Sequence, residues 1–296
     1  MSLKSSLIGT GVAIITPFNE DHSIDFEALG KVIDFQIEGG INYLVTLGTT
    51  GETPTISREE QIQIIEFTYQ KAGGRVPVVV GIGGNNTAAV VEMLKSYPLQ
   101  KATAILSSAP YYSKPSQEGI FQHYKALAEA SPKPILLYNV PHRTGKNIEA
   151  ATVIRLAKEV SNIGGIKEAC GNFTQFANIL RDVPADFLVT SGEDDIMIPQ
   201  IAMGMQGVIT VAGNAFPKEI STIVNLALDG KFKEATEQNN KILDLFTLLF
   251  NENNPAGIKA FLFEKGLIKN ELRLPVVPLS ETNHQKIRDF LQAYKG

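Results

Sequence analysis

Ile163-Gly164-Gly165-Ile166-Lys167 is a short apolar run that ends in a lysine, and a helical pattern over residues 172–181 follows it. An apolar run of this length predicts a strand buried on both faces, as in parallel sheets. The segment therefore predicts one strand–helix unit of an α/β protein.

Together with seven similar units, this segment gives eight strand–helix units that alternate strictly along the chain and end near Asp229-Gly230. The predicted strands cover residues 12–16, 43–47, 76–80, 102–106, 134–138, 163–167, 187–190 and 207–211. The predicted helices cover residues 25–38, 57–71, 87–96, 116–130, 150–160, 172–181, 195–203 and 217–228, and Ser57 with Glu60 forms a capping box. Eight such units favour a closed (β/α)₈ TIM barrel, which needs about 250 residues, over an open sheet.

The rest of the chain reads as a helical region. Helical patterns cover residues 231–250, 254–265 and 284–294, which are too few to predict an independent domain and are expected to pack on the side of the barrel. We therefore predict a barrel catalytic domain over residues 1–229 and a C-terminal helical extension over residues 230–296.

Composition narrows the class of protein. Hydrophobic residues make up 44% of the 296 residues and charged residues 20%, as in soluble globular proteins. The net charge of -4 and the lack of a basic run argue against a nucleic-acid partner. The run of residues 9–16 near the N-terminus is too short, and too soon interrupted by Pro17, to be a signal or membrane segment. The single cysteine fits a reducing compartment, so we expect a cytoplasmic enzyme with no membrane partner.

Lys167 is the residue that most needs a chemical explanation. Removing an ammonium from water is costly, so a buried lysine either finds a partner or loses its charge. A neutral amine is a nucleophile that can form a Schiff base with a carbonyl compound. The alternative is a lysine that extends to the barrel rim or pairs with Glu168.

Further unusual residues follow the predicted strands, where a barrel of this type carries its chemistry. The turn Gly48-Thr-Thr-Gly51 offers N–H groups and hydroxyls to a carboxylate, although such turns are often only turns. Tyr138 could relay protons or simply pack, and Arg143 could hold a carboxylate or simply face solvent.

Several other chemistries find no support in the sequence. The glycines from Gly81 to Gly84 lack the third glycine of a dinucleotide-binding motif and are better explained as a loop between strand and helix. The four histidines are scattered without ligand spacing, so we expect no metal. Cys170 has no histidine nearby in the chain and is expected to be a small buried thiol.

Taken together, the motifs resemble the dihydrodipicolinate synthase family of pyruvate-dependent class I aldolases. The resemblance covers essentially the whole chain and is carried by Gly48-Thr-Thr-Gly-Glu52, Tyr111-Tyr112, Pro115-Ser-Gln-Glu-Gly119, Tyr138-Asn-Val-Pro-His-Arg-Thr-Gly145 and Gly165-Ile-Lys-Glu-Ala169. It implies a homotetramer built as a dimer of dimers. It also implies a lyase that condenses pyruvate with L-aspartate 4-semialdehyde to 4-hydroxy-tetrahydrodipicolinate in the biosynthesis of diaminopimelate and lysine.

The resemblance assigns four catalytic residues. Lys167 would form an imine with C2 of pyruvate, so that no separate cofactor is needed. Tyr138 would shuttle protons, linked through the hydroxyl of Thr49 to Tyr112, which is expected to reach the active site of the neighbouring subunit.

Four further residues are implied to bind the substrates. Thr50 would hold the pyruvate carboxylate through its N–H group and Arg143 the carboxylate of the semialdehyde, while Gly192 and Ile209 would line the pocket. Sialate lyases of the same family lack the arginine and carry Ser-Thr in place of Thr49-Thr50. The remaining alternative, from another class, is a barrel that binds a small acid without reacting.

One departure from the family concerns regulation. In members inhibited by lysine, histidines and a glutamate bind that amino acid near the dimer interface, and the matching positions here are Pro54, Arg58, Gln61 and Ala89. Without the glutamate the lysine ammonium loses its partner, so we predict weak inhibition by lysine or none.

Overall fold

The structure, a computed structural model, describes residues 3–294 and contains a closed barrel of eight parallel strands. The strands are β1 Gly9–Ala13, β2 Tyr43–Thr46, β3 Val78–Gly81, β4 Ala104–Ser108, β5 Ile135–Asn139, β6 Ile163–Glu168, β7 Leu188–Ser191 and β8 Gly207–Thr210. Each strand pairs with the next, and β8 closes the barrel on β1. The predicted (β/α)₈ barrel is confirmed.

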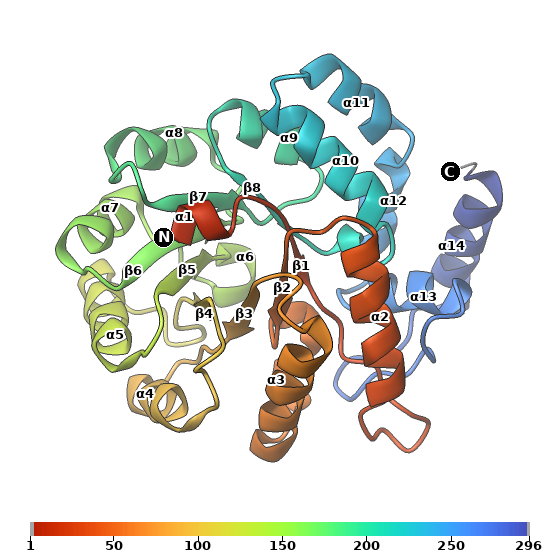
Figure 1. Ribbon diagram of the computed structural model, residues 1–296, viewed down its shortest axis with the longest axis horizontal. Helices are drawn as coiled ribbons and strands as arrows, with labels where there is room; N and C mark the ends of the chain where they lie inside the picture. Colours follow the sequence, from red (N-terminus) through yellow and green to blue (C-terminus); the bar gives the residue numbers. More distant parts are fainter. Residues whose placement is uncertain (1–2, 295–296) are drawn as a thin grey trace.

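A ring of helices surrounds the strands (Figure 1). It consists of α2 Phe26–Glu38, α3 Arg58–Ala72, α4 Thr87–Ser96, α5 Gln117–Ala130, α7 Ala150–Glu159, α8 Phe173–Asp182, α9 Met197–Ala202 and α10 Pro217–Leu228, and the short α1 Leu3–Ser6 precedes β1. The predicted capping box is present, because Ser57 Oγ accepts from Glu60 N at 3.2 Å and Ser57 N donates to the Glu60 carboxylate at 2.9 Å. Within residues 3–294, no helix combines the length and the apolar composition that crossing a membrane requires.

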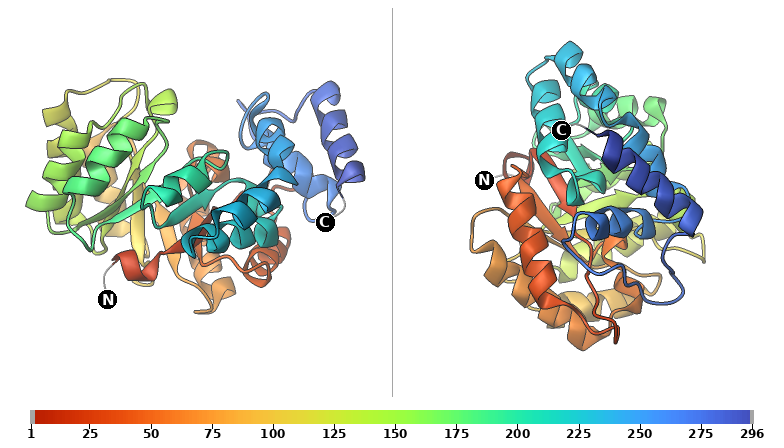
Figure 2. Two further views of the ribbon diagram at one scale, coloured as in Figure 1. Left: turned by 90° about the horizontal axis from the view of Figure 1, so that it is seen from above. Right: turned by 90° about the vertical axis from the view of Figure 1, so that its right-hand side faces the viewer.

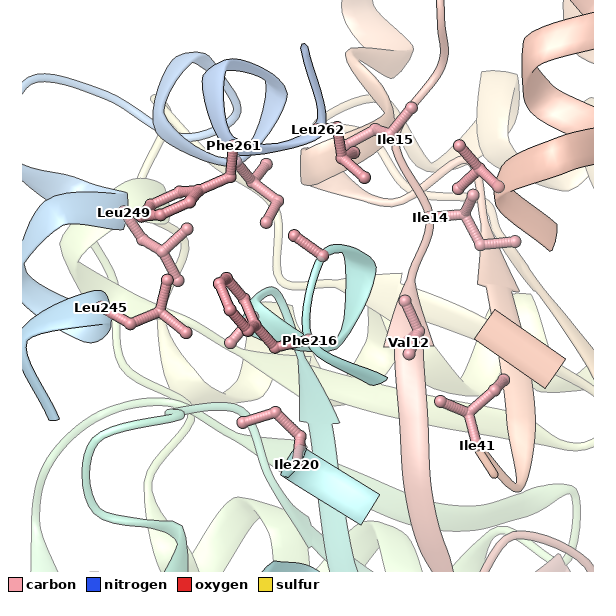
Figure 3. Close-up of a cluster of buried hydrophobic side chains, with 14 of the residues drawn as sticks. Val12, Ile14, Ile15, Ile41, Phe216, Ile220, Leu245, Leu249, Phe261 and Leu262 are labelled. Carbon is pink, nitrogen blue, oxygen red and sulfur yellow. The ribbon is translucent and has the colours of Figure 1, made fainter. Parts of the chain in front are cut away.

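The first strand begins three residues earlier than predicted, at Gly9 rather than Val12. The apolar run misled the prediction because Ile14 and Ile15 follow the strand and are buried in the hydrophobic core, where Ile15 lies next to Leu262 of α13 (Figure 3). Their burial comes from contacts between segments distant in the sequence, which local periodicity does not report.

The helix predicted over residues 231–250 is wrong as a single element. It is two helices, α11 Phe232–Asn240 and α12 Leu243–Phe250. The break falls after Asn239-Asn240, a pair of residues with low helix propensity, and it lets α12 turn its apolar face toward the core.

The C-terminal helices share a hydrophobic core with the barrel. Leu245 and Leu249 of α12 and Phe261 of α13 (Ala256–Glu264) lie near Phe216, whose ring meets that of Phe261 edge-on at 5.6 Å (Figure 3). Figure 2 shows α13 and α14 (Glu281–Ala293) gathered at one end of the molecule. One hydrophobic core therefore spans both parts. The division into two regions at residues 229–230 stays a prediction.

Candidate active site

A cavity of about 780 Å³ is lined by residues from the carboxyl ends of the strands. It brings together the predicted site residues except Tyr112 and Ile209: the lining includes Thr49, Thr50, Tyr138, Arg143, Lys167 and Gly192. These residues come from loops and strands far apart in the sequence, so the barrel alone makes them neighbours.

Lys167 lies on β6 with only 5% of its surface exposed, so it does not extend to the rim. Its Nζ lies 4.3 Å from the centroid of the Tyr138 ring, on the neighbouring strand β5. It does not pair with Glu168, because successive side chains of a strand point to opposite faces and the Glu168 carboxylate is bound elsewhere. Both alternative readings of Lys167 are therefore excluded.

Gly192 leaves the space that the Lys167 side chain occupies. A Cβ at this position would lie 2.8 Å from Lys167 Cε, 2.9 Å from Ala169 Cβ and 3.1 Å from Glu168 O. The backbone approaches closely here as well, since Gly192 N donates to Glu168 O at 2.6 Å. Any larger residue would displace the end of the lysine.

The Gly48–Gly51 turn has a strained backbone on both sides. Leu47 and Glu52 each have φ of 56°, a left-handed conformation that non-glycine residues rarely adopt. Between them Thr49–Gly51 forms a single 3₁₀ turn, whose first N–H groups have no partner within the turn. The turn thus offers Thr49 and Thr50 donors to the cavity.

The C-terminal region holds this turn from the other side. Asn254 Nδ2 donates to Thr50 Oγ1 at 3.1 Å, and the ammonium of Lys259 in α13 forms a completely buried ion pair with Glu52. Residues of α12 also line the cavity, so the C-terminal helices do more than cover the barrel side. The sequence offered one signal for this contribution, the polar run Glu252-Asn-Asn254 before an apolar helix.

Arg143 sits on a helix that the sequence analysis missed, α6 Pro141–Thr144. The signals were present, since proline favours the first helical position and Gly145 ends the helix in a left-handed conformation with φ of 73°. Among residues 3–294 no carboxylate lies within ion-pair distance of Arg143. Its guanidinium is therefore available to an anion in the cavity.

Carboxylates also line the cavity: Glu193, Asp194, Asp195, Asp244 and Glu252. Asp194, which the sequence analysis overlooked, is buried and accepts from Val211 N and Ala212 N at 3.0 and 2.9 Å. Burial raises the pKa of Asp194, while those N–H groups and Lys167 oppose the rise. The cavity can thus receive a ligand with both negative and positive groups.

Two predicted site residues lie away from the cavity. Tyr112 is 89% exposed on a loop where its φ is 69°. Ile209, on β8, is completely buried in a cluster inside the barrel that includes Tyr138, and its expected place in the pocket lining stays a prediction. Val211, two residues further on, lines the cavity.

The remaining motifs have structural roles. Gly81, the last residue of β3, lets this strand approach the turn after β2, since a Cβ there would lie 2.1 Å from Leu47 O. Burial, with Glu168 adding to it, raises the pKa of Cys170 to about 12, so this thiol stays protonated and is a poor nucleophile. No three His, Cys, Asp or Glu side chains within residues 3–294 come together in a way that could hold a metal ion.

The chain is similar to proteins of one family along nearly its whole length. The Dihydrodipicolinate synthetase family matches residues 6–294. The 4-hydroxy-tetrahydrodipicolinate synthase of Parabacteroides distasonis is 51% identical over 287 residues, which are 97% of each chain, and that of Phocaeicola vulgatus is 49% identical over 99% of each.

Solved structures agree with these relatives. Dihydrodipicolinate synthase from Thermotoga maritima has a TM-score of 0.95 at 37% identity, covering 98% of this chain and 99% of that one. A similar structure, with a TM-score of 0.94 at 37% identity over 98% of this chain and 97% of that one, is of the first monomeric dihydrodipicolinate synthase variant. On the sequence match, the shared barrel and the cavity at its carboxyl end, this chain belongs to the dihydrodipicolinate synthetase family.

Proposed function

We propose that this chain condenses pyruvate with L-aspartate 4-semialdehyde to give 4-hydroxy-tetrahydrodipicolinate and water, the reaction of the synthases that its relatives are named for. The observation that carries the proposal is Lys167, an amine that is 5% exposed and lines a cavity together with Arg143, neither of which forms an ion pair with a carboxylate of residues 3–294. An amine in such a place is suited to capture a keto acid.

The reaction proceeds through carbon–carbon bond formation on the lysine. The Lys167 amine attacks C2 of pyruvate, water leaves, and the resulting protonated imine draws electrons so that the methyl group loses a proton. The enamine carbon attacks the aldehyde carbon of the second substrate. The amino group of that substrate then attacks C2, closes the ring and releases Lys167, so that no metal or separate cofactor takes part.

The residues around Lys167 place pyruvate and move protons. Thr50 N–H binds the pyruvate carboxylate at the open end of its turn, and Gly192 leaves room for the imine. Tyr138, whose ring contacts the amine, takes protons from the reacting centre and returns them through Thr49.

The second substrate carries a carboxylate and an ammonium, and the cavity offers a partner for each. Arg143 binds the carboxylate through two parallel hydrogen bonds, and the carboxylates of the lining favour the ammonium. A sugar acid has no ammonium, so the carboxylates of the lining would not increase its binding affinity. This charge arrangement supports the synthase over a sialate lyase.

Assembly completes the proton relay in this proposal. Tyr112 is 89% exposed on a strained loop and does not line the cavity of its own chain, and in this proposal a neighbouring subunit receives it. We place the protein in a homotetramer, a dimer of dimers, in the cytoplasm, where its one free cysteine stays reduced.

A direct assay separates the candidate functions. Purified protein should consume pyruvate only when aspartate semialdehyde is added, and it should leave N-acetylneuraminate intact. Cleavage of N-acetylneuraminate without condensation would favour a sialate lyase. No turnover of either kind would favour a barrel that binds without reacting.

Replacing Arg143 with alanine should raise KM for aspartate semialdehyde by a factor of about 10 to 100, because a charged hydrogen-bonding pair is lost. The Arg143→Lys variant keeps the charge but loses the planar fork, so it should recover only part of the affinity. Steady-state kinetics with each substrate varied in turn provide the test, and KM for pyruvate should stay near its original value. An equal loss for both substrates would show that Arg143 does not bind the second one.

L-Lysine should inhibit this enzyme weakly or not at all. A second cavity of about 540 Å³ includes Pro54, Gln61 and Tyr111 in its lining, and Arg58 nearby packs its cation over Tyr97. No acid stands at positions 54, 58, 61 or 89 to pair with an ammonium, and Arg58 repels one. Initial rates measured across a lysine titration should stay flat, and strong inhibition below millimolar concentration would contradict this.

A further inference from the structure

A set of hydrogen-bonded side chains, three of them buried and one half-buried, lies behind the active-site wall. This set, here called the amide–carboxylate network, consists of Asn139, Asn147, Glu168 and Gln175. Asn139 Nδ2 donates to both Glu168 oxygens at 3.1 and 3.0 Å and to Asn147 Oδ1 at 2.7 Å. Gln175 Nε2 donates to Glu168 Oε1 at 2.9 Å and its Oε1 accepts from Asn147 Nδ2 at 2.8 Å. The network is continuous.

The network lies on the opposite face of the barrel wall from the cavity. Asn139 and Glu168 are paired residues of β5 and β6, and the pair before them is Tyr138 and Lys167. Because side chains alternate along a strand, the first pair faces outward when the second faces the cavity. Tyr138 and Lys167 line the cavity, while Asn139 and Glu168 are fully buried and do not.

The network also anchors the segment of residues 140–147, here called the Arg143 loop. Asn147 is its last residue, and Ile148 beyond it donates through its N–H to Asn139 Oδ1 at 2.9 Å. The carbonyl of Ile148 accepts from Gln175 Nε2 at 3.1 Å. The end of the loop is thereby tied to β5, β6 and α8 at once.

We propose that the amide–carboxylate network positions Tyr138, Lys167 and the Arg143 loop for the condensation, an inference that rests on the function proposed above. Its members touch neither substrate, so they act through the residues they hold. Groups that orient reacting residues have a large effect on the reaction rate, because displacing a reacting atom by about 1 Å can lower the rate about 100-fold.

Glu168 makes the network sensitive to pH. Amide groups donate hydrogen bonds to both of its oxygens, which suits the ionised carboxylate. A protonated carboxyl would place its own O–H donor against these N–H donors. The titratable groups that face it are Cys170, which stays protonated, and Glu193 on the loop after β7. Burial raises the pKa of Glu168 to about 7, against the opposing effect of Gln175.

The Glu168→Gln variant tests this directly, because glutamine resembles the protonated form. The ratio of kcat for the original protein to kcat for the variant should rise about tenfold between pH 6 and pH 8, as Glu168 ionises in the original alone. Glu193 is present in both proteins and cancels in the ratio. A ratio that stays constant across this pH range would overturn the proposal.

The Asn147→Ala variant tests the link to the Arg143 loop. KM for aspartate semialdehyde should rise about tenfold or more, because Arg143 is displaced, while pyruvate still forms its adduct with Lys167 at nearly the original rate. Asn162→Ala is the matched control: it removes an amide that bonds three carbonyls at 3.0 to 3.2 Å just before β6, at the other end of the strand. An equal rise in KM in both variants would mean loss of stability only and would overturn the proposal.

Hydrogen exchange separates this inference from the proposed function. Amides of residues 140–147 should exchange faster in Asn147→Ala and in Glu168→Gln than in the original protein, and Asn162→Ala should leave them unchanged. If the original protein forms no adduct with pyruvate, the proposed function fails, yet this exchange pattern would still support the network. Unchanged exchange in all three variants would overturn the network whatever the reaction.

Discussion

Replacing Lys167 with alanine should lower kcat for the condensation by a factor of about 10⁴ or more, because the nucleophile that forms the imine is lost. Among residues 3–294 the cavity lining offers no second amine: its other nitrogen-bearing side chains are Arg143, His142 and the amides of Asn253 and Asn254. An arginine is always protonated, a carboxamide is not nucleophilic and an imidazole is not a primary amine, so none of them can form the imine. A coupled assay with both substrates gives the measurement.

The Lys167→Arg variant serves as the control for charge. Arginine keeps a cation over the Tyr138 ring but cannot form an imine, so its activity should be as low as that of the alanine variant. Both variants should remain folded, as judged by circular dichroism. Substantial turnover in the arginine variant would mean that Lys167 acts as a charge and not as a nucleophile.

Replacing Gly192 with alanine should lower kcat about 100-fold without unfolding the protein. The added Cβ would lie 2.8 Å from Lys167 Cε, so the flexible end of the lysine must move, and a reacting group displaced by about 1 Å loses about this factor. The rate at which pyruvate becomes attached to Lys167, measured by quenching with borohydride at successive times, should fall in parallel.

The matched control is Gly30→Ala, in the middle of α2. A Cβ at Gly30 meets its nearest neighbours at 3.4 Å, an ordinary contact, and alanine favours a helix, so both activity and stability should be retained. If Gly192→Ala forms the pyruvate adduct as fast as the original protein, the close fit between Gly192 and Lys167 has no part in the reaction.

The barrel was predictable because its information is local. Each strand is an apolar run of the right length, each helix has its own apolar face and often its own cap, and strict alternation leaves few topologies. The same reasoning placed Lys167, Tyr138 and Gly192 at strand ends, and closure of the barrel then made them neighbours. For these three residues, the position relative to a predicted strand was sufficient to predict that they belong to the site.

The rest of the site depends on contacts between distant segments. Asn254 reaches Thr50 across 204 positions in the sequence, and α12, which begins after the break that follows Asn240, lines the cavity. Local patterns do not show which distant segments meet, and the polar run Glu252-Asn-Asn254 was the one local signal of this contribution. Glu168 is a different case: the alternation of side chains along β6 is enough to place it on the face opposite Lys167, yet the sequence analysis left a pair between these two residues open.

The central claim is that the nitrogen of Lys167 becomes bonded to a carbon of pyruvate. The most direct measurement treats the protein with pyruvate and sodium borohydride and locates the modification by mass spectrometry of the intact chain and its peptides. We expect one reduced pyruvate per chain, on the peptide that contains Lys167, and none when pyruvate is left out. An unmodified chain, or an adduct on another lysine, would contradict the account.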